Sequence, residues 1–313
     1  MKLCIVIPCY NEEAVLKETA AAVKGVLESL IVEGEISNNS KIAFIDDGSK
    51  DKTWEIIKAL SSNDELFEGI KLSRNKGHQN ALLAGLMTVK DNFDAVISMD
   101  ADLQDDISAI FDMIKSYKDG NEIVYGVRSS RKTDSAFKRA TAKGFYKVMK
   151  LLGAETVSDH ADYRLMSKKA LDALSEFSEV NLFLRGIVPL IGFKSAIVYY
   201  ERGKRAAGDS KYLLKKMLSF AFEGITSLSI KPIELILRLG VIISVFGFGF
   251  LVYTLVQHLL NNTTAGWTSL IGSIWILGGL QIFSIGVIGK YIGKIYMETK
   301  RRPRYIVEEN TME

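Results

Sequence analysis

The sequence predicts an α/β protein with a mostly parallel sheet and a membrane-anchored C-terminal part. Through the N-terminal half, short apolar runs alternate with segments whose apolar residues recur at helical spacing. Near the C-terminus, two long stretches carry no charge. The 313 residues are enough for one sizeable α/β domain and a smaller addition. With 40 Lys and Arg against 37 Asp and Glu, the net charge of +3 does not indicate a nucleic-acid partner.

Strand patterns and helix patterns alternate along the first hundred residues. The predicted strands cover residues 3–7, 41–45, 70–72 and the apolar run that begins at Val96. The predicted helices between them cover residues 12–30, 52–60 and 79–89. Because strand–helix–strand connections place parallel strands side by side, this order predicts a sheet with helices on both faces.

Acid-bearing loops follow three of the predicted strands. They read Pro-Cys-Tyr-Asn-Glu-Glu at 8–13, Asp-Asp-Gly-Ser-Lys-Asp at 46–51, and Asp-Ala-Asp-Leu-Gln-Asp-Asp at 100–106. The carboxyl ends of parallel strands meet at one edge of a sheet, where open α/β folds bind their ligands. We therefore expect these loops to form one polar site. For each loop taken singly, an ordinary solvated turn or helix start is the alternative interpretation.

Asp100 and Asp102 form the centre of this predicted site. They are two residues apart at a strand end, so both carboxylates can turn toward one divalent ion. Mg²⁺ and Mn²⁺ prefer hard oxygen ligands, and Mg²⁺ usually keeps a substrate phosphate in its shell. The glycine-rich motifs of dinucleotide-binding and P-loop proteins do not occur in the sequence. The pattern thus favours a nucleotide diphosphate held through acids and Mg²⁺ or Mn²⁺.

Several motifs resemble those of family 2 glycosyltransferases with the GT-A fold, and in particular those of the polyprenyl-phosphate sugar transferases. These segments, in chain order, are 6–13 (VIPCYNEE), 46–51 (DDGSKD), 74–77 (RNKG), 99–104 (MDADLQ), 125–128 (YGVR), 162–166 (DYRLM) and 205–212 (RAAGDSKY). The resemblance covers nearly the whole chain. It implies an inverting transfer of one sugar from a nucleotide diphosphate, with a UDP-sugar favoured, to a polyprenyl phosphate of the undecaprenyl type.

The resemblance also implies roles for individual residues. Nucleotide and donor contacts are implied for Pro8, Tyr10, Glu12, Asp46, Asp47, Asp100, Ala101, Arg205 and Lys211. Metal ligation is implied for Asp100, Asp102 and Gln104, and catalytic roles for Asp102, Asp162 and Arg128. At Asp106 the chain departs from the pattern of the family that it resembles, in which Pro is common, so the resemblance does not specify the shape of the loop after the metal motif. Asp162 either accepts a proton or orients a substrate, and Asp159 could share that role.

The C-terminal part predicts two membrane spans. Residues 239–257 and 268–289 carry no charge, and each run is long enough to cross a bilayer. Lys and Arg lie before and after the pair but not in the connection 258–267, so the positive-inside rule places the catalytic domain in the cytoplasm. Residues 212–225 predict a basic amphipathic helix at the headgroup level, with a domain-packing helix as the alternative.

These patterns divide the chain into four parts. They are a cytoplasmic catalytic domain (1–210), an interfacial segment (211–232), a two-helix membrane region (233–293) and a basic cytoplasmic tail (294–313). A homo-oligomer is compatible with the sequence but is not specified by it. Two other functions compete with the transferase: a processive polysaccharide synthase of the same fold, and a non-enzymatic scaffold tethered to the membrane.

Overall fold

The computed structural model describes residues 1–129, 160–180, 182–201, 229, 231–259 and 266–312. These residues fall into two compact units. The sheet unit holds the described N-terminal residues up to 201 together with Arg302–Glu313, and the helical unit holds two long helices. The predicted amphipathic helix 212–225, Asp159, Arg205 and Lys211 lie outside the described residues.

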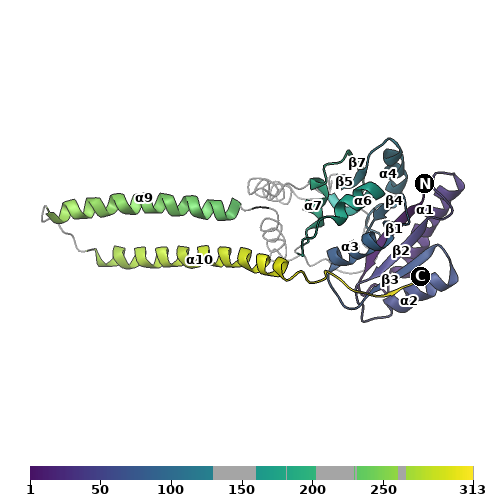
Figure 1. Cartoon of the computed structure of the whole chain (residues 1–313), viewed down its shortest axis with the longest axis horizontal. Helices are drawn as coiled ribbons and strands as arrows, with labels where there is room; N and C mark the ends of the chain where they lie inside the picture. Colours follow the sequence, from purple (N-terminus) through teal and green to yellow (C-terminus); the bar gives the residue numbers. More distant parts are fainter. Residues whose placement is uncertain (130–159, 181, 202–228, 230, 260–265, 313) are drawn as a thin grey trace. The chain divides into compact units, whose positions relative to one another are not determined.

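The sheet unit is built on one eight-stranded sheet in the order β7-β5-β6-β4-β1-β2-β3-β8 (Figure 1). The strands are β1 (Leu3–Cys9), β2 (Lys41–Asp46), β3 (Phe67–Leu72), β4 (Ala95–Ser98), β5 (Ile123–Arg128), β6 (His160–Ser167), β7 (Ser195–Tyr200) and β8 (Val307–Asn310). The neighbours β4, β1, β2 and β3 are all parallel. β6 runs antiparallel to β4 and β5, and β8 runs antiparallel to β3. The predicted mostly parallel α/β sheet is therefore confirmed.

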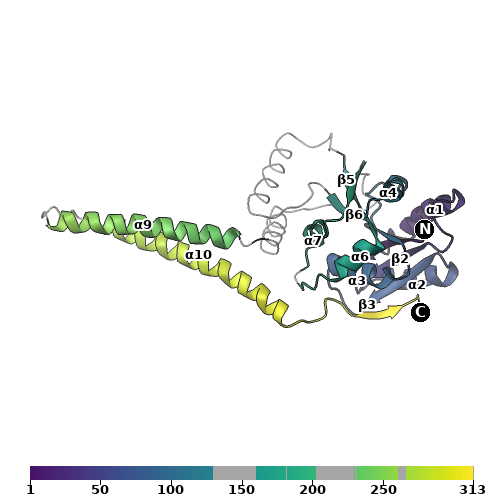
Figure 2. The ribbon, with the colours of Figure 1, turned by 45° about the horizontal axis from the view of Figure 1, so that its top comes forward.

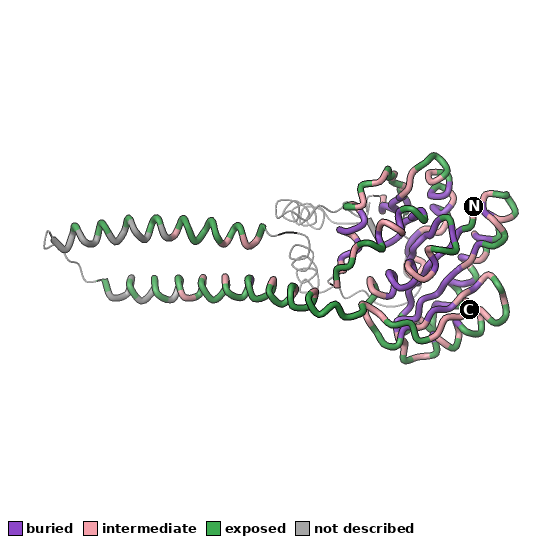
Figure 3. The backbone as a smooth tube through the Cα atoms, in the orientation of Figure 1, coloured by how far each residue is buried: buried purple, intermediate pink, exposed green. Residues whose placement is uncertain are grey.

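The central strands are buried on both faces, which explains their nearly continuous apolar sequence. Along β1, Leu3, Ile5 and Ile7 pack into one hydrophobic cluster, while Cys4 and Val6 pack into the other. This alternation follows from the two-residue period of side chains in a strand. Figure 3 shows the strands as the buried centre of the unit. The cysteines Cys4 and Cys9 are free and buried, and burial raises the pKa of both thiols.

Helices cover both faces of the sheet. One face packs against α1 (Leu16–Val32), α2 (Thr53–Asn63) and α4 (Ala109–Lys118). The other face packs against α3 (His78–Val89), α6 (Lys168–Ser175) and α7 (Leu184–Leu190). α3 lies very close to the strands, since a Cβ at Gly85 would stand 2.6 Å from a methyl group of Val6 and 2.7 Å from Cγ1 of Ile45. The helices predicted at 12–30, 52–60 and 79–89 all form, although α1 begins four residues later than expected.

The end of the chain returns to the sheet as β8. Glu309 contacts α2, accepting hydrogen bonds from the indole of Trp54 at 3.2 Å and from Lys58 at 2.6 Å. Thr311 extends the pairing with β3, because its hydroxyl accepts from the backbone N–H of Gly69 and its own N–H donates to the Gly69 carbonyl. The last residues of the predicted basic tail thus form an eighth strand.

The helical unit consists of α9 (Lys231–Leu259) and α10 (Trp267–Thr299). The two helices lie side by side in Figures 1 and 2. Large apolar side chains of both are exposed, including Phe246 at 76% and Ile282 at 74%. Among the residues that were searched, one segment, Ile276–Thr299, has the length and composition to cross a membrane. The expected pair of spans is therefore not confirmed by this criterion.

Removal of β8 tests its contribution to the sheet. Deleting residues 307–313 unpairs the edge of β3 and removes the contacts of Glu309 and Thr311 with α2 and β3. We expect the thermal midpoint of the detergent-solubilised protein to fall by about 4 °C or more, because 1 kcal/mol shifts the midpoint of a unit of this size by about 2–4 °C. Glu308→Gln is the control, since its ion pair with Lys71 is half exposed and should change the midpoint little. An unchanged midpoint after the deletion would contradict a stabilising role for β8.

Candidate active site

The loops that follow β1 and β2 are held together by hydrogen bonds between side chains and backbone. The Asn11 N–H donates to Oγ of Ser49 at 2.9 Å, and the Lys50 N–H donates to Oδ1 of Asn11 at 2.8 Å. The next residue, Glu12, donates its N–H to Oγ1 of Thr53 at 2.9 Å. Asn11 has a φ of +55°, a left-handed conformation that Asn tolerates better than most residues. The two loops therefore form one rigid rim at the carboxyl edge of the sheet.

Asp46 and Asp47 are both buried at the end of β2 but have different partners. The carboxylate of Asp46 accepts from the Ser49 N–H at 3.1 Å, and burial raises its pKa. Asp47 accepts from the N–H groups of Lys76 at 2.7 Å and Gly77 at 2.9 Å. The two backbone segments nearly touch, since a Cβ at Gly48 would lie 2.6 Å from the Arg74 carbonyl carbon. Asp47 thus fixes the residues that lead into α3.

The loop after β4 carries the predicted metal ligands. Within this loop Leu103 adopts an unfavourable left-handed conformation with a φ of +52°. Oδ1 of Asp102 accepts a hydrogen bond from the Gln104 N–H at 3.2 Å. Between the two aspartates, the Ala101 carbonyl accepts a 2.7 Å hydrogen bond from the buried hydroxyl of Thr19 on α1. Gln104 is buried, whereas Asp100 and Asp102 are partly exposed. The two carboxylates are therefore accessible, and the loop that carries them is anchored to α1 by the hydrogen bond from Thr19.

Asp105 ties the same loop to β5 and β7. Its Oδ1 accepts from the hydroxyl of Tyr200 at 2.6 Å and from Nη2 of Arg128 at 3.3 Å. Arg128 also donates from Nε to the Tyr200 hydroxyl at 3.2 Å. Asp105 is 3% exposed, and its Oδ2 has no hydrogen-bond partner among the described residues. Arg128 therefore lies beside the loop after β4, where it is bound to Asp105.

Asp162 lies at the beginning of β6 and is surrounded by basic side chains. Because β6 runs antiparallel to β4, its first residues reach the same edge as the end of β4, with Arg164 opposite Ser98. Oδ1 of Asp162 accepts from Nη2 of Arg164 at 2.6 Å and from Nε of Arg185 at 3.3 Å. Oδ2 accepts from Nη2 of Arg185 at 3.1 Å. Nε2 of His78, on α3, is 3.5 Å from Oδ2 of Asp162 and 3.5 Å from Oδ1 of Asp100.

The two carboxylates near His78 have opposite pKa shifts. Burial alone would raise the pKa of Asp162, but the hydrogen bond from His78 and the charges of Arg185 and Arg164 hold it well below its ordinary value. Burial raises the pKa of Asp100, and the carboxylates of Asp105, Asp162 and Asp102 raise it further, against the opposing effect of His78. Negative charge is therefore in excess at Asp100 and compensated at Asp162.

This excess of negative charge fits a divalent cation at Asp100 and Asp102. Both offer hard carboxylate oxygens at an accessible loop, which is the donor chemistry that Mg²⁺ and Mn²⁺ prefer. Among the described residues, no group of three or more His, Cys, Asp or Glu side chains forms a metal site.

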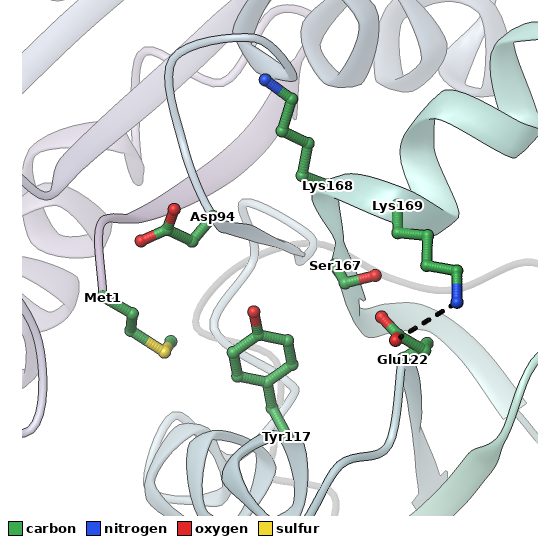
Figure 4. Close-up of a pocket in the computed structure, with 7 residues that line it drawn as sticks. All are labelled: Met1, Asp94, Tyr117, Glu122, Ser167, Lys168 and Lys169. Atoms are coloured by element: carbon green, nitrogen blue, oxygen red, sulfur yellow. Dashed lines mark ion pairs between the residues drawn. The ribbon is translucent and has the colours of Figure 1, made fainter.

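Figure 4 shows a separate hollow in the sheet unit. Its volume is about 270 Å³, and its lining includes Asp94, Tyr117, Glu122, Lys168 and Lys169. Asp94 and Glu122 immediately precede β4 and β5, so this hollow lies at the amino ends of these strands, away from the acid-bearing loops. It has no part in the candidate site.

Comparison with known proteins agrees with this geometry. Residues 4–175 match the family model described as Glycosyl transferase family 2. The chain belongs to glycosyl transferase family 2.

It is 55% identical over 310 residues to the glycosyltransferase YkoT of Bacillus subtilis (strain 168), covering 98% of this chain and 91% of the relative. It is 38% identical over 310 residues to the prophage bactoprenol glucosyl transferase homolog of Escherichia coli (strain K12), covering 98% and 99%. It is also 38% identical over 312 residues to the SfII prophage-derived bactoprenol glucosyl transferase of Shigella flexneri, covering 99% and 98%.

The family assignment confirms the resemblance predicted from the motifs, and the mostly parallel α/β sheet is a GT-A-like fold. The sequence interpretation did not assign roles to five residues of this glycosyl transferase site: His78, Asp105, Arg164, Arg185 and Tyr200. Three of them adjoin or belong to motifs already recognised, and their proximity to an acid motif could have indicated them. Arg185 and Tyr200 lie in no such motif, and the tertiary fold alone brings them to the site.

Proposed function

We propose that this family 2 glycosyl transferase moves one sugar from a nucleotide diphosphate, with a UDP-sugar favoured, to a polyprenyl phosphate at the cytoplasmic face of the membrane. The observation that carries the proposal is the match to two proteins named bactoprenol glucosyl transferase, which extends over 98% or more of this chain. Bactoprenol is a polyprenyl alcohol, and the match includes the two apolar helices as well as the sheet unit. The product would be a lipid-phosphate-linked sugar.

The nucleotide would bind along the rim formed by the first two loops. In this proposal Pro8, Tyr10 and Glu12 line the nucleoside pocket, and Asp46 accepts hydrogen bonds from the base or ribose. Tyr10 is 40% exposed at the rim, which suits a side chain that covers a bound nucleoside. Asp47 would contribute indirectly, since its carboxylate holds the backbone at Lys76 and Gly77.

The diphosphate would lie at the loop after β4. Asp100, Asp102 and Gln104 would hold Mg²⁺ or Mn²⁺, and Ala101 would approach the donor between the two aspartates. When bound, the ion neutralises charge that develops on the leaving nucleotide diphosphate. Arg205 and Lys211, outside the described residues, are proposed to add cations near the phosphates.

In the transfer itself, a phosphate oxygen of the acceptor forms a bond to the anomeric carbon while the bond to the nucleotide diphosphate breaks, which inverts the configuration. A phosphate monoester is largely dianionic near pH 7, so it needs no strong general base. We assign Asp162 to orienting the reacting groups. Arg128 would act as a cation at the phosphates from its position beside Asp105.

We infer two membrane spans from the course of the chain. β3 precedes α9 and β8 follows α10, yet both strands pair in one sheet. The chain must therefore leave and return on the same side of any membrane, so the number of crossings is even. If Ile276–Thr299 of α10 crosses, α9 is the helix available to cross in the other direction, because its 29 residues exceed the roughly 20 needed.

A transfer assay tests the proposed function. Membranes containing the protein are incubated with undecaprenyl phosphate and a panel of radiolabelled UDP- and GDP-sugars, and organic-soluble label is counted. We expect one donor to give lipid-linked label at least about tenfold above that of membranes lacking the protein. Polymeric label would instead support a polysaccharide synthase, and the absence of label with every donor would support a scaffold.

Metal dependence is tested by chelation and by substitution. We expect excess EDTA to abolish transfer and Mg²⁺ or Mn²⁺ to restore it. Asp102→Asn should lower the transfer rate about 100-fold or more without unfolding the protein, because Asp102 lies on a partly exposed loop and not in the core. Asp91→Asn, at an exposed surface carboxylate, is the matched control and should retain full activity. Undiminished transfer in EDTA would contradict the metal assignment.

Cysteine labelling tests the membrane topology. Thr264→Cys, in the connection between α9 and α10, should react with a membrane-impermeant maleimide added to intact cells. Ser62→Cys, exposed on α2 of the sheet unit, should react only after lysis. The native cysteines are buried and should contribute little background. Labelling of Ser62→Cys in intact cells would reverse the predicted orientation.

A further inference from the structure

Among the described residues, both oxygens of the Asp162 carboxylate are in contact with protein side chains that can donate protons. An ionised carboxylate offers about four lone-pair sites. In Asp162 these sites face Arg164 and Arg185 at Oδ1, and Arg185 and His78 at Oδ2. The side chain is 8% exposed. Asp162 therefore acts on the reaction through the groups that it holds.

We infer that Arg185 is a positioning residue for sugar transfer. Its guanidinium contacts both oxygens of Asp162, at 3.3 and 3.1 Å, which sets the plane of the carboxylate. With the plane set, Oδ2 faces His78, and His78 bridges to Asp100 on the loop after β4. The inference rests on the proposed function. It adds Arg185, which lies outside the recognised motifs, to the residues that this function requires.

A continuous series of contacts connects the rim formed by the loops after β1 and β2 to Arg185. Asp47 holds the backbone at Lys76 and Gly77, immediately before α3. The next residue is His78, and Gln79 accepts a 2.9 Å hydrogen bond from the N–H of Leu184 through Oε1. Leu184 begins α7 and directly precedes Arg185. The start of α3 therefore presents His78 to Asp162 and also anchors the helix that presents Arg185 to it.

The other side of Asp162 is held by the sheet. Its backbone carbonyl accepts a hydrogen bond from the buried hydroxyl of Ser98 on β4. Its Oδ1 accepts from Arg164, which is 2% exposed and lies on the same strand. Ser98 and Arg164 thus fix the backbone of Asp162 and one of its carboxylate oxygens. The contact that Arg185 of α7 makes then determines the rotation of the carboxylate group that remains free. A planar, two-pronged donor suits this task, and the single ammonium of lysine does not.

Steady-state kinetics of three variants test this role. The substrates are UDP-glucose and undecaprenyl phosphate, or the donor of the panel that the wild type uses. We expect Arg185→Gln to lower kcat about 100-fold while the KM for the donor changes less than about threefold, because the rim is untouched. Arg185→Lys should recover part of kcat. The control is Lys169→Gln, whose ion pair with Glu122 lies at the opposite edge of the sheet, and it should behave as the wild type.

A double-mutant cycle shows whether Arg185 acts through Asp162. In an Asp162→Asn background, adding Arg185→Gln should lower kcat by less than about threefold more, because the contact is already lost. Additive losses, or a wild-type kcat for Arg185→Gln, would overturn the inference while leaving the proposed function intact. A wild type inactive with every donor would overturn both.

Folding is monitored separately in these variants. Calorimetry of UDP binding should give wild-type affinity for Arg185→Gln, because the nucleotide rim does not include α7. If that variant does not fold, Gln79→Met replaces it, since it removes the anchor of α7 and keeps the length of the side chain. We expect Gln79→Met to lower kcat at constant donor KM, though by less than Arg185→Gln. An unchanged kcat in a folded Gln79→Met would overturn the inference.

Discussion

The carboxylate of Asp162 is the charge on which the arrangement of this active site depends. Its three basic neighbours, two arginines and a histidine, come from β6, α7 and the start of α3, so one side chain joins three separate elements. Removing one partner of a buried charge pair typically costs about 3–5 kcal/mol. Without Asp162, two guanidinium groups would face each other at the edge of the sheet. The position of α7 against α3 is therefore coupled to the chemistry of the site.

Asp100 and Asp162 show how burial and neighbouring charge give similar residues different tasks. Both face His78, yet the pKa of Asp100 is raised by burial and by surrounding acids, while that of Asp162 is lowered by its cations in spite of burial. Negative charge is in excess around Asp100, whereas the arginines compensate it at Asp162. In the proposed mechanism, this difference separates the side of the site that would bind a metal ion from the side that would orient the reacting groups.

The GT-A-like sheet and the three acid-bearing loops could be predicted from the sequence, because they depend on local patterns. Apolar runs of strand length between amphipathic helices specify parallel strands, and turn-forming acids specify where the strands end. β3 is longer than predicted, since Phe67, Glu68 and Gly69 belong to it as well. β8 was not predicted, because a short polar strand at the end of the chain is stabilised by pairing with β3 and not by its own composition.

By itself, the sequence determined the fold class, the family and the acids at the carboxyl edge of the sheet, because motif residues and hydrophobic periodicity are local properties of the chain. Only the tertiary structure decided what surrounds each acid. The antiparallel course of β6 brings Asp162 to the edge where β4 ends, and the packing of α7 on α3 brings Arg185 to Asp162. A charge pair forms wherever the fold brings opposite charges within a few ångströms, and contacts between distant segments leave no periodic pattern in the sequence.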